Sequence, residues 1–374
     1  MQSITAMGAQ RRCLETTDCG WTRRIFLKSS VLSAAGCVLA TGSARAAEPP
    51  VNPADQWMTV TGSVRSLSAR TILSHEHVTT DFLGAEKLPV PRYDRGKAFD
   101  LIAPHFDKLA QRGVGLLVEC TPAHIGRDVL LLRRLSEASG VRILTNTGYY
   151  GAVDNKFLPR HAFTESADAL AERWRKEWEE GIEGTGVRPG FIKLGTGNGR
   201  LSDLHAKLLR AACRVHRETG LTIAVHTGDG EAAKDEVRIL GEEGVAPSAL
   251  VWVHAQNDPG PVQIELAKRG VWISLDGYSL ATRNPERYRN FLVAHREAGT
   301  LGRVLVSHDD GWAVEGDAPA GSELKLFGNG NPAPYSAIFE RLLMDLRDAG
   351  FGEANLNRLT RSNPADAWRV RRRG

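Results

Sequence analysis

The sequence predicts an α/β fold, a TIM (β/α)8 barrel with a short N-terminal β-hairpin, from three observations. Short apolar runs rich in Val, Ile and Leu, typical of buried parallel strands, alternate eight times with helical patterns. The stretch 57–67 alternates as a hairpin does. Four histidines, a lysine and an aspartate stand at the ends of five of these runs. A closed barrel brings such ends to one mouth more readily than a doubly wound open sheet, the alternative fold.

The expected elements alternate along the chain. Strands are expected at 71–75, 115–119, 142–147, 191–194, 222–226, 250–254, 272–276 and 304–308. Helices are expected at 128–138, 167–180, 203–218, 262–269, 288–298 and 335–349. The segment 310–334, rich in Gly and Pro, follows the eighth strand. Because catalytic groups lie at this end of a barrel, we interpret the segment as a substrate lid or pocket wall, with disorder as the alternative.

The first 46 residues have the pattern of an export leader. A basic stretch precedes a short apolar core, and Ala44–Ala46 forms a small-x-small cleavage site. The segment 22–28 (TRRIFLK) resembles a twin-arginine signal. We therefore expect domains at 1–46 and 47–374, and export to the periplasm or outside by the twin-arginine machinery. A buried N-terminal helix and a lipidated Cys37 are the alternatives.

Charge and cysteine content exclude several classes of protein. The chain has 48 basic and 44 acidic residues, of which the leader holds six and two, so 42 of each remain. A near-neutral chain whose only basic cluster is the tail 369–373 does not predict nucleic-acid binding, and we interpret that tail as a solvated end. Cys120 and Cys213 form no disulfide framework and are interpreted as core thiols.

Six residues form the candidate metal site. Each stands at the end of an apolar run: His75, His77, Lys193, His226, His254 and Asp309. Because residues two apart in a strand point the same way, the first two histidines can reach one metal together. Imidazole and carboxylate ligands suit zinc, manganese, cobalt or nickel better than calcium. The sequence therefore predicts divalent metal ions, with zinc as the first choice.

Lys193 needs its own explanation. A lysine that closes a buried strand is costly unless it is paired or chemically altered. A deprotonated lysine can take up carbon dioxide to form a carbamate, which is a bridging carboxylate. The alternative is a lysine that extends to the rim of the barrel.

Seven stretches together resemble the phosphotriesterase family of the amidohydrolase superfamily over 57–368. They are SHEHV at 74–78, IGRDV at 125–129, GIEGTGVRPGFIKLGTG at 181–197, AVHTG at 224–228, VWVHA at 251–255, VSHDD at 306–310 and SNPA at 362–365. The resemblance implies that His75, His77 and Asp309 hold the more buried metal and that His226 and His254 hold the more exposed one. A carbamylated Lys193 and a hydroxide bridge the two ions, and Asp309 accepts the proton of the attacking hydroxide.

Two positions depart from the family pattern. The family keeps a His or an Arg after the aspartate of strand 7, where this chain has Gly277, and an acid where it has Asn257. The proton relay away from the metals is therefore altered or absent. Tyr150 stands where the family keeps an aromatic residue after strand 3, and the resemblance implies contact with the substrate. Tyr149 and Tyr278 are further candidates, as are His124 and His161.

The expected function is that of an exported hydrolase of ester bonds. A lactone or carboxylic ester is favoured, and a phosphotriester is the other substrate class. The alternatives are a metal-dependent binding protein without catalysis and a one-metal amidase or deaminase. The resemblance also implies a homodimer.

Overall fold

The computed structural model describes residues 56–374 except 68–69, 88–90, 259, 282 and 318–319. The leader predicted over 1–46, with Cys37, lies outside the described residues. Within the described part, no helix has the length and apolar character needed to cross a bilayer.

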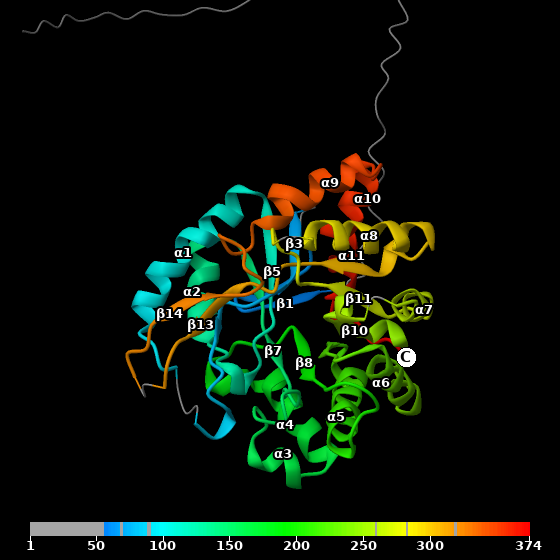
Figure 1. Ribbon diagram of the computed structural model, residues 1–374. Coiled ribbons are helices and arrows are strands. Elements are labelled where there is room, and N and C mark those ends of the chain that lie inside the picture. The colour runs from blue at the N-terminus through cyan, green and yellow to red at the C-terminus, as the bar shows by residue number, and fades with distance from the viewer. Residues whose placement is uncertain (1–55, 68–69, 88–90, 259, 282, 318–319) are drawn as a thin grey trace, which may run out of the picture. The chain divides into compact units, whose positions relative to one another are not determined.

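Parallel strands occupy eight positions around a TIM barrel, as predicted (Figure 1). They are β3 (Thr71–Glu76), β5 (Val114–Glu119), the split pair β6 (Arg142–Leu144) and β7 (Asn146–Thr147), β8 (Phe191–Gly195), β9 (Thr222–His226), β10 (Leu250–Val253), β11 (Trp272–Leu275) and β12 (Val304–Val306). One sheet has the order β3-β5-β6 and the other runs in sequence from β7 to β12. The Asp309 amide donates to the His75 carbonyl at 3.2 Å, which closes the barrel between the chain ends of β12 and β3.

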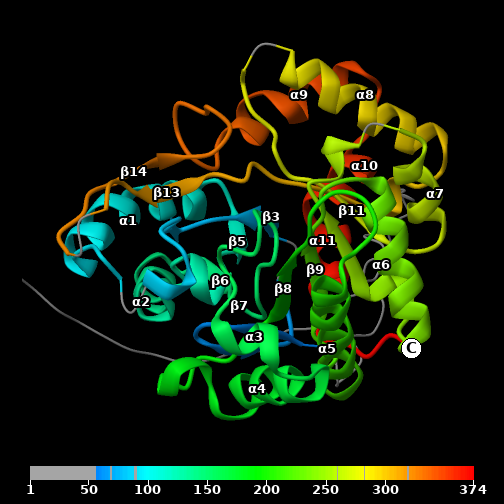
Figure 2. The ribbon, with the colours of Figure 1, turned by 60° about the horizontal axis from the view of Figure 1, so that its bottom comes forward.

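Helices follow the strands and lie outside them (Figure 2). They are α1 (Arg95–Gln111), α2 (Val129–Ser139), α3 (Arg160–Thr164), α4 (Ala167–Glu180), α5 (Asp203–Thr219), α6 (Gly230–Glu242), α7 (Val262–Lys268), α8 (Asn284–Glu297), α9 (Leu343–Asp348), α10 (Glu353–Asn357) and α11 (Asn363–Ala367). Capping explains several boundaries: Asp128 and Ser202 accept from amides in the first turns of α2 and α5. Gly140 and Gly220 end these helices in the left-handed conformation.

Apolar side chains fill the inside of the barrel. Strand residues such as Ile72, Leu116 and Phe191 form one buried cluster with Trp57 and Trp368. The ring of Phe191 lies 4.8 Å from that of Trp368. Side chains therefore fill the end of the barrel that is opposite the carboxyl ends of the strands. The polar site must therefore lie at the other end.

The N-terminal hairpin and the C-terminal tail meet at the filled end of the barrel. The predicted hairpin is present as β1 (Trp57–Thr59) and β2 (Gly62–Val64), which pair antiparallel. Gln56 forms a bridge with Val370. The prediction of a solvated tail is wrong for Arg373, which is 7% exposed and donates to the Asp366 carbonyl at 2.8 Å. Its guanidinium donates hydrogen bonds to backbone carbonyls at this end of the barrel.

The segment after β12 is a hairpin. β13 (Gly311–Val314) and β14 (Leu324–Phe327) pair antiparallel, and β13 also pairs with β4 (Thr79–Thr80). Phe327 lines the cavity at the strand ends. The prediction of a pocket wall in this segment is therefore confirmed.

Candidate metal centre

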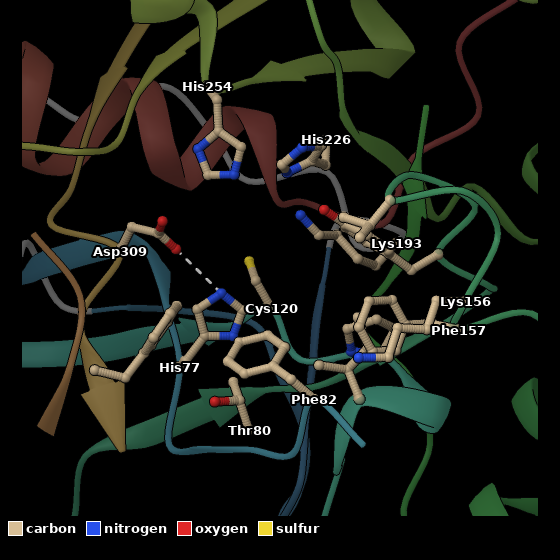
Figure 3. Close-up of a pocket in the computed structure, with 15 residues that line it drawn as sticks. His77, Thr80, Phe82, Cys120, Lys156, Phe157, Lys193, His226, His254 and Asp309 are labelled. Carbon is tan, nitrogen blue, oxygen red and sulfur yellow. Dashed lines mark ion pairs between the residues drawn. The ribbon is translucent and has the colours of Figure 1, made fainter. Parts of the chain in front are cut away.

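A cavity of about 330 Å³ opens at the carboxyl ends of the barrel strands (Figure 3). Five of the six predicted ligands line it: His77, Lys193, His226, His254 and Asp309. His75 is fully buried against them, with its ring 5.1 Å from that of His254. The structure thus brings all six residues to one place.

Distances within the cluster are short. His75 Nε2 and His77 Nε2 lie 3.2 and 3.1 Å from the same oxygen, Oδ1 of Asp309. The rings of His226 and His254 are 4.5 Å apart. Ligand atoms of His75, His254 and Asp309 all lie within 4.8 Å of one another, close enough to hold a metal ion.

Two of these residues have left-handed backbone. His254 has φ 62° and Asp309 has φ 60°, which costs a non-glycine residue about 1–2 kcal/mol. Each follows the last residue of a strand or lies shortly beyond it, so the turn redirects the side chain over the barrel mouth. Backbone strain of this kind clusters at functional sites, where the surrounding structure must hold it.

Neighbouring side chains orient the histidine rings. Nδ1 of His254 lies 2.7 Å from Oδ1 of Asp276, and Nδ1 of His77 lies 2.8 Å from Oγ1 of Thr121. Because these bonds use Nδ1, Nε2 is the ring nitrogen that can bind a metal. Asp276 is not among the site residues predicted from the sequence. Like the candidate ligands, however, it is a polar residue at the end of an apolar strand.

The protonation states of His75, His226 and Asp309 suit metal binding. Burial, reinforced by the charge of Lys193, lowers the pKa of His75 to about 4, and burial lowers the pKa of His226 well below its usual value. Burial also lowers the pKa of His254, but Asp276 and Asp309 outweigh it and the net shift is upward. For Asp309, burial raises the pKa, but the nearby histidines outweigh this and hold it far below its usual range. The carboxylate is thus ionised.

Several buried polar atoms in the cluster make no hydrogen bond within the described residues. They are Nδ1 and Nε2 of His75 and Oδ1 of Asp309, which have one another, His77 and Asp276 as close polar neighbours. Lys193 is 2% exposed, and no carboxylate of the described chain lies within ion-pair distance of its Nζ. Unpaired buried groups are costly. Divalent ions bound by imidazole and carboxylate would satisfy them, so the residues fit a metal centre.

Gly277, which stands in place of the family's relay residue, has no room for a larger side chain. A Cβ there would lie 2.9 Å from Nε2 of Gln256 and 3.0 Å from Oη of Tyr288. The Gly277 amide donates to Tyr288 Oη at 2.7 Å, and Gln256 Nε2 donates to Asp276 at 3.0 Å. The buried amide of Gln256 and the phenol of Tyr288 therefore fill the space beside Gly277. Asn257 is exposed.

Tyr150 lines the cavity, and its ring lies 5.0 Å from that of His226. Burial and the charge of Asp309 raise its pKa, so the phenol is neutral. The Tyr150 ring can lie here because residue 195 is glycine: a Cβ on Gly195 would lie 2.6 Å from Tyr150 Cδ2.

The other aromatic and histidine candidates are outside the cavity lining. Tyr149 bonds His161 at 2.9 Å and packs against His124, and Tyr278 is fully buried against Tyr288. None of these four side chains lines the cavity, and their contact with a substrate stays a prediction.

Cys120 is a buried free thiol, as predicted, but it lines the cavity as well (Figure 3). Burial raises the pKa of its thiol well above the usual value, which keeps it neutral. Sequence reasoning also missed the aromatic wall, Phe82, Phe157 and Phe327, because these residues come from separate loops.

Comparisons with known proteins agree with this geometry. The model of the phosphotriesterase family matches residues 56–368. The phosphotriesterase homology protein of Escherichia coli is 28% identical over 296 residues, 78% of this chain and 96% of that protein. The aryldialkylphosphatase of Saccharolobus solfataricus is 27% identical over 307 residues, 81% of this chain and 96% of that protein. A solved phosphotriesterase-like lactonase mutant of Deinococcus radiodurans is 30% identical, with a TM-score of 0.72 over 83% of this chain and 99% of its own.

Proposed function

We propose a specific reaction for this chain, which belongs to the phosphotriesterase family and is a hydrolase that acts on ester bonds. The reaction is metal-dependent hydrolysis of a lactone or carboxylic ester by a binuclear centre at the barrel mouth. One observation carries it: His75 and Asp309 have buried ligand atoms that make no hydrogen bond and lie within 4.8 Å of a ligand atom of His254, at the floor of the cavity.

The chain's own residues have separate roles in this proposal. His75, His77 and Asp309 would hold one ion, and His226 and His254 the other. Lys193, as a carbamate, would supply the carboxylate shared between them. Two divalent ions held there would acidify a water molecule and polarise the oxygen of the ester.

Asp309 would accept the proton from the attacking water, since its carboxylate faces the cavity and is ionised. Asp276 would keep His254 in the orientation that offers Nε2 to the metal. Tyr150, a neutral phenol on the cavity wall, would contact the substrate beside His226.

Zinc is the proposed metal, with manganese, cobalt or nickel as alternatives.

The cavity wall and the relatives support the proposed substrate class. Aromatic side chains on the wall suit an aliphatic or aromatic ester. The lactonase of similar structure supports a lactone, and the aryldialkylphosphatase supports a phosphotriester as a side reaction.

The proposal is tested by following proton release at constant pH from the metal-loaded protein. The panel holds a lactone, a carboxylic ester, a phosphotriester, a phosphodiester and an N-acyl amide, each with and without a chelator. We expect chelator-sensitive turnover of the lactone or the carboxylic ester. Amide cleavage with one bound metal would favour the amidase. Two bound metals with no turnover on any substrate would favour a binding protein.

Export and assembly belong to the same proposal. We infer that the twin-arginine signal at 22–28 takes the protein out of the cytoplasm, to the periplasm or beyond, and that two copies associate. Cell fractionation of the native chain beside a variant with Lys at 23 and 24 tests the first inference. Light scattering from the processed protein tests the second.

A further inference from the structure

The loop after β7 contains an unusual left-handed turn. Three consecutive non-glycine residues, Val153, Asp154 and Asn155, have φ of 58°, 53° and 61°. L-residues enter this region at a cost of about 1–2 kcal/mol each, and a β-branched residue such as valine does so rarely. A run of three persists only if its surroundings hold it firmly.

Hydrogen bonds to α5 and to the end of β8 stabilise this turn. The Asn155 amide donates to the Gly151 carbonyl at 3.2 Å, and His205 Nε2 on α5 lies 2.9 Å from Asn155 Oδ1. The Gly151 amide in turn donates to the Gly195 carbonyl, at the end of β8, at 2.9 Å. Gly151 permits this arrangement, since a Cβ there would lie 2.8 Å from His205 Nε2.

The turn sets Lys156 on the wall of the catalytic cavity. The Lys156 carbonyl accepts from the Ala85 amide at 3.2 Å, which ties this loop to the loop after β4. Its Nζ lies 5.4 Å from the ring centre of Phe157, and Figure 3 shows the two side chains together at the cavity. Lys156 also lines a neighbouring hollow of about 340 Å³, together with Lys87.

Lys156 is the one charged residue of the cavity lining that is not a predicted metal ligand. No carboxylate among the described residues forms an ion pair with it, whereas the nearby Arg92 binds Asp81 at 2.7 Å. Phe82, Phe157 and Phe327 make up much of the surrounding wall. An unpaired cation on an apolar wall attracts a complementary anion and excludes cations.

We propose that Lys156 makes the site selective for esters that carry a negative charge on the part remote from the bond that is cleaved. This inference rests on the proposed ester hydrolysis. The aromatic wall contacts the carbon skeleton of the substrate, and the lysine pairs with its carboxylate. The strained turn maintains this position at the mouth.

The test compares two matched esters, 4-acetoxybenzoate and its neutral methyl ester, on the metal-loaded protein. Lys156→Met should lower the ratio of kcat/KM, anionic over neutral, by about 2- to 5-fold, as expected for an exposed charge pair. Lys156→Glu should lower it further. Lys87→Met, which removes a charge from the neighbouring hollow only, should leave the ratio unchanged. Raising the ionic strength should reduce the wild-type ratio toward that of Lys156→Met.

A binding measurement separates this inference from the proposed function. Calorimetry with 4-acetamidobenzoate and its methyl ester reports anion preference without ester cleavage. If wild-type protein cleaves neither ester but prefers the anionic amide, and Lys156→Met removes that preference, the hydrolase fails and anion selection stands. If Lys156→Met and Lys87→Met lower the ratio equally, or neither changes it, Lys156 is a solvated lysine and the inference is overturned.

Discussion

Asp276 holds His254 at two points: its Oδ1 lies 2.7 Å from the ring Nδ1, and its Oδ2 accepts from the backbone amide at 3.1 Å. The same carboxylate lies 3.5 Å from Nδ1 of His75. One buried acid therefore orients His254 and lies beside His75, a candidate ligand of the other metal. Burial raises its pKa, but His254 and His75 outweigh this, so the group is ionised.

Asp276→Asn should lower metal affinity by about 10- to 100-fold, because the amide keeps the size of the carboxylate but loses its charge and half of its acceptors. Excess metal should restore much of the activity. Titration of metal-free protein with Zn²⁺ measures the change. Wild-type affinity in this variant would show that Asp276 has no part in orienting the ligands.

Lys193→Ala and Asp309→Ala should each reduce turnover at least about a hundredfold, since a direct ligand contributes more than a residue that orients one. Circular dichroism should show that the barrel still folds, because both side chains lie at its mouth and outside the apolar core. Metal content per chain is the second readout. Wild-type turnover in either variant contradicts the mechanism.

Gly195→Ala should displace Tyr150, since the new Cβ would lie 2.6 Å from its ring, within the distance where atoms must move. We expect a loss of about 1–3 kcal/mol in stability and a changed KM. Gly197→Ala is the matched control, because nothing lies within 4 Å of a Cβ there. Equal effects of the two substitutions would show that the packing of Tyr150 on Gly195 is unimportant.

The buried carboxyl group of Glu236, which bonds Thr227 next to His226, should make the stability of the protein depend on pH. It is fully buried on α6 and accepts from Thr196 and Thr227, and burial raises its pKa to about 8 from 4.5. Between pH 4.5 and 8 the carboxyl group of Glu236 is ionised in the unfolded chain and protonated in the folded chain. Stability is therefore full below pH 4.5 and falls as pH rises toward 8.

Glu236→Gln should remove that loss. The variant should match wild type near pH 4.5 and exceed it at pH 9 by about 1–3 kcal/mol, less than the full shift because the folded state relaxes. Urea unfolding across this range measures it. Glu231→Gln, at an exposed position of the same helix, should leave the profile unchanged. A parallel profile for Glu236→Gln and wild type would contradict the assignment.

Arg373→Ala should destabilise the protein by about 1–3 kcal/mol, because its removal leaves the Asp366 carbonyl and Thr222 Oγ1 without this donor. Arg372→Ala, at an exposed position, should cost less than about 0.5 kcal/mol. Thermal unfolding compares the two. If both cost the same, the buried position of Arg373 has no energetic consequence.

The barrel and its six candidate ligands could be predicted because both depend on local patterns. Buried strands such as Thr222–His226 are continuous apolar runs, and a polar residue at their end stands out. Strand 8 shows the limit: it ends at Val306, and the left-handed turn at Asp309 has no signal in the sequence.

The wall and the tail could not be predicted, because they depend on which distant segments meet. Phe82 and Phe327 lie 245 positions apart, and their rings are 5.4 Å apart only because β13 pairs with β4. Arg373 looks like a solvated charge until Thr222 and the Asp366 carbonyl surround it. Tertiary contacts of this kind override composition.

The bridge between Gln56 and Val370 has a consequence for biosynthesis. Residues near the two ends of the described chain complete one wall of the molecule, and the Arg373 carbonyl accepts from Ala246 at 3.1 Å. A ribosome adds about 5–20 residues per second and shields the segment it has just made. Gln56 therefore waits for its partner until the chain as far as Val370 has left the ribosome, and a chain stalled before Val370 lacks this bridge.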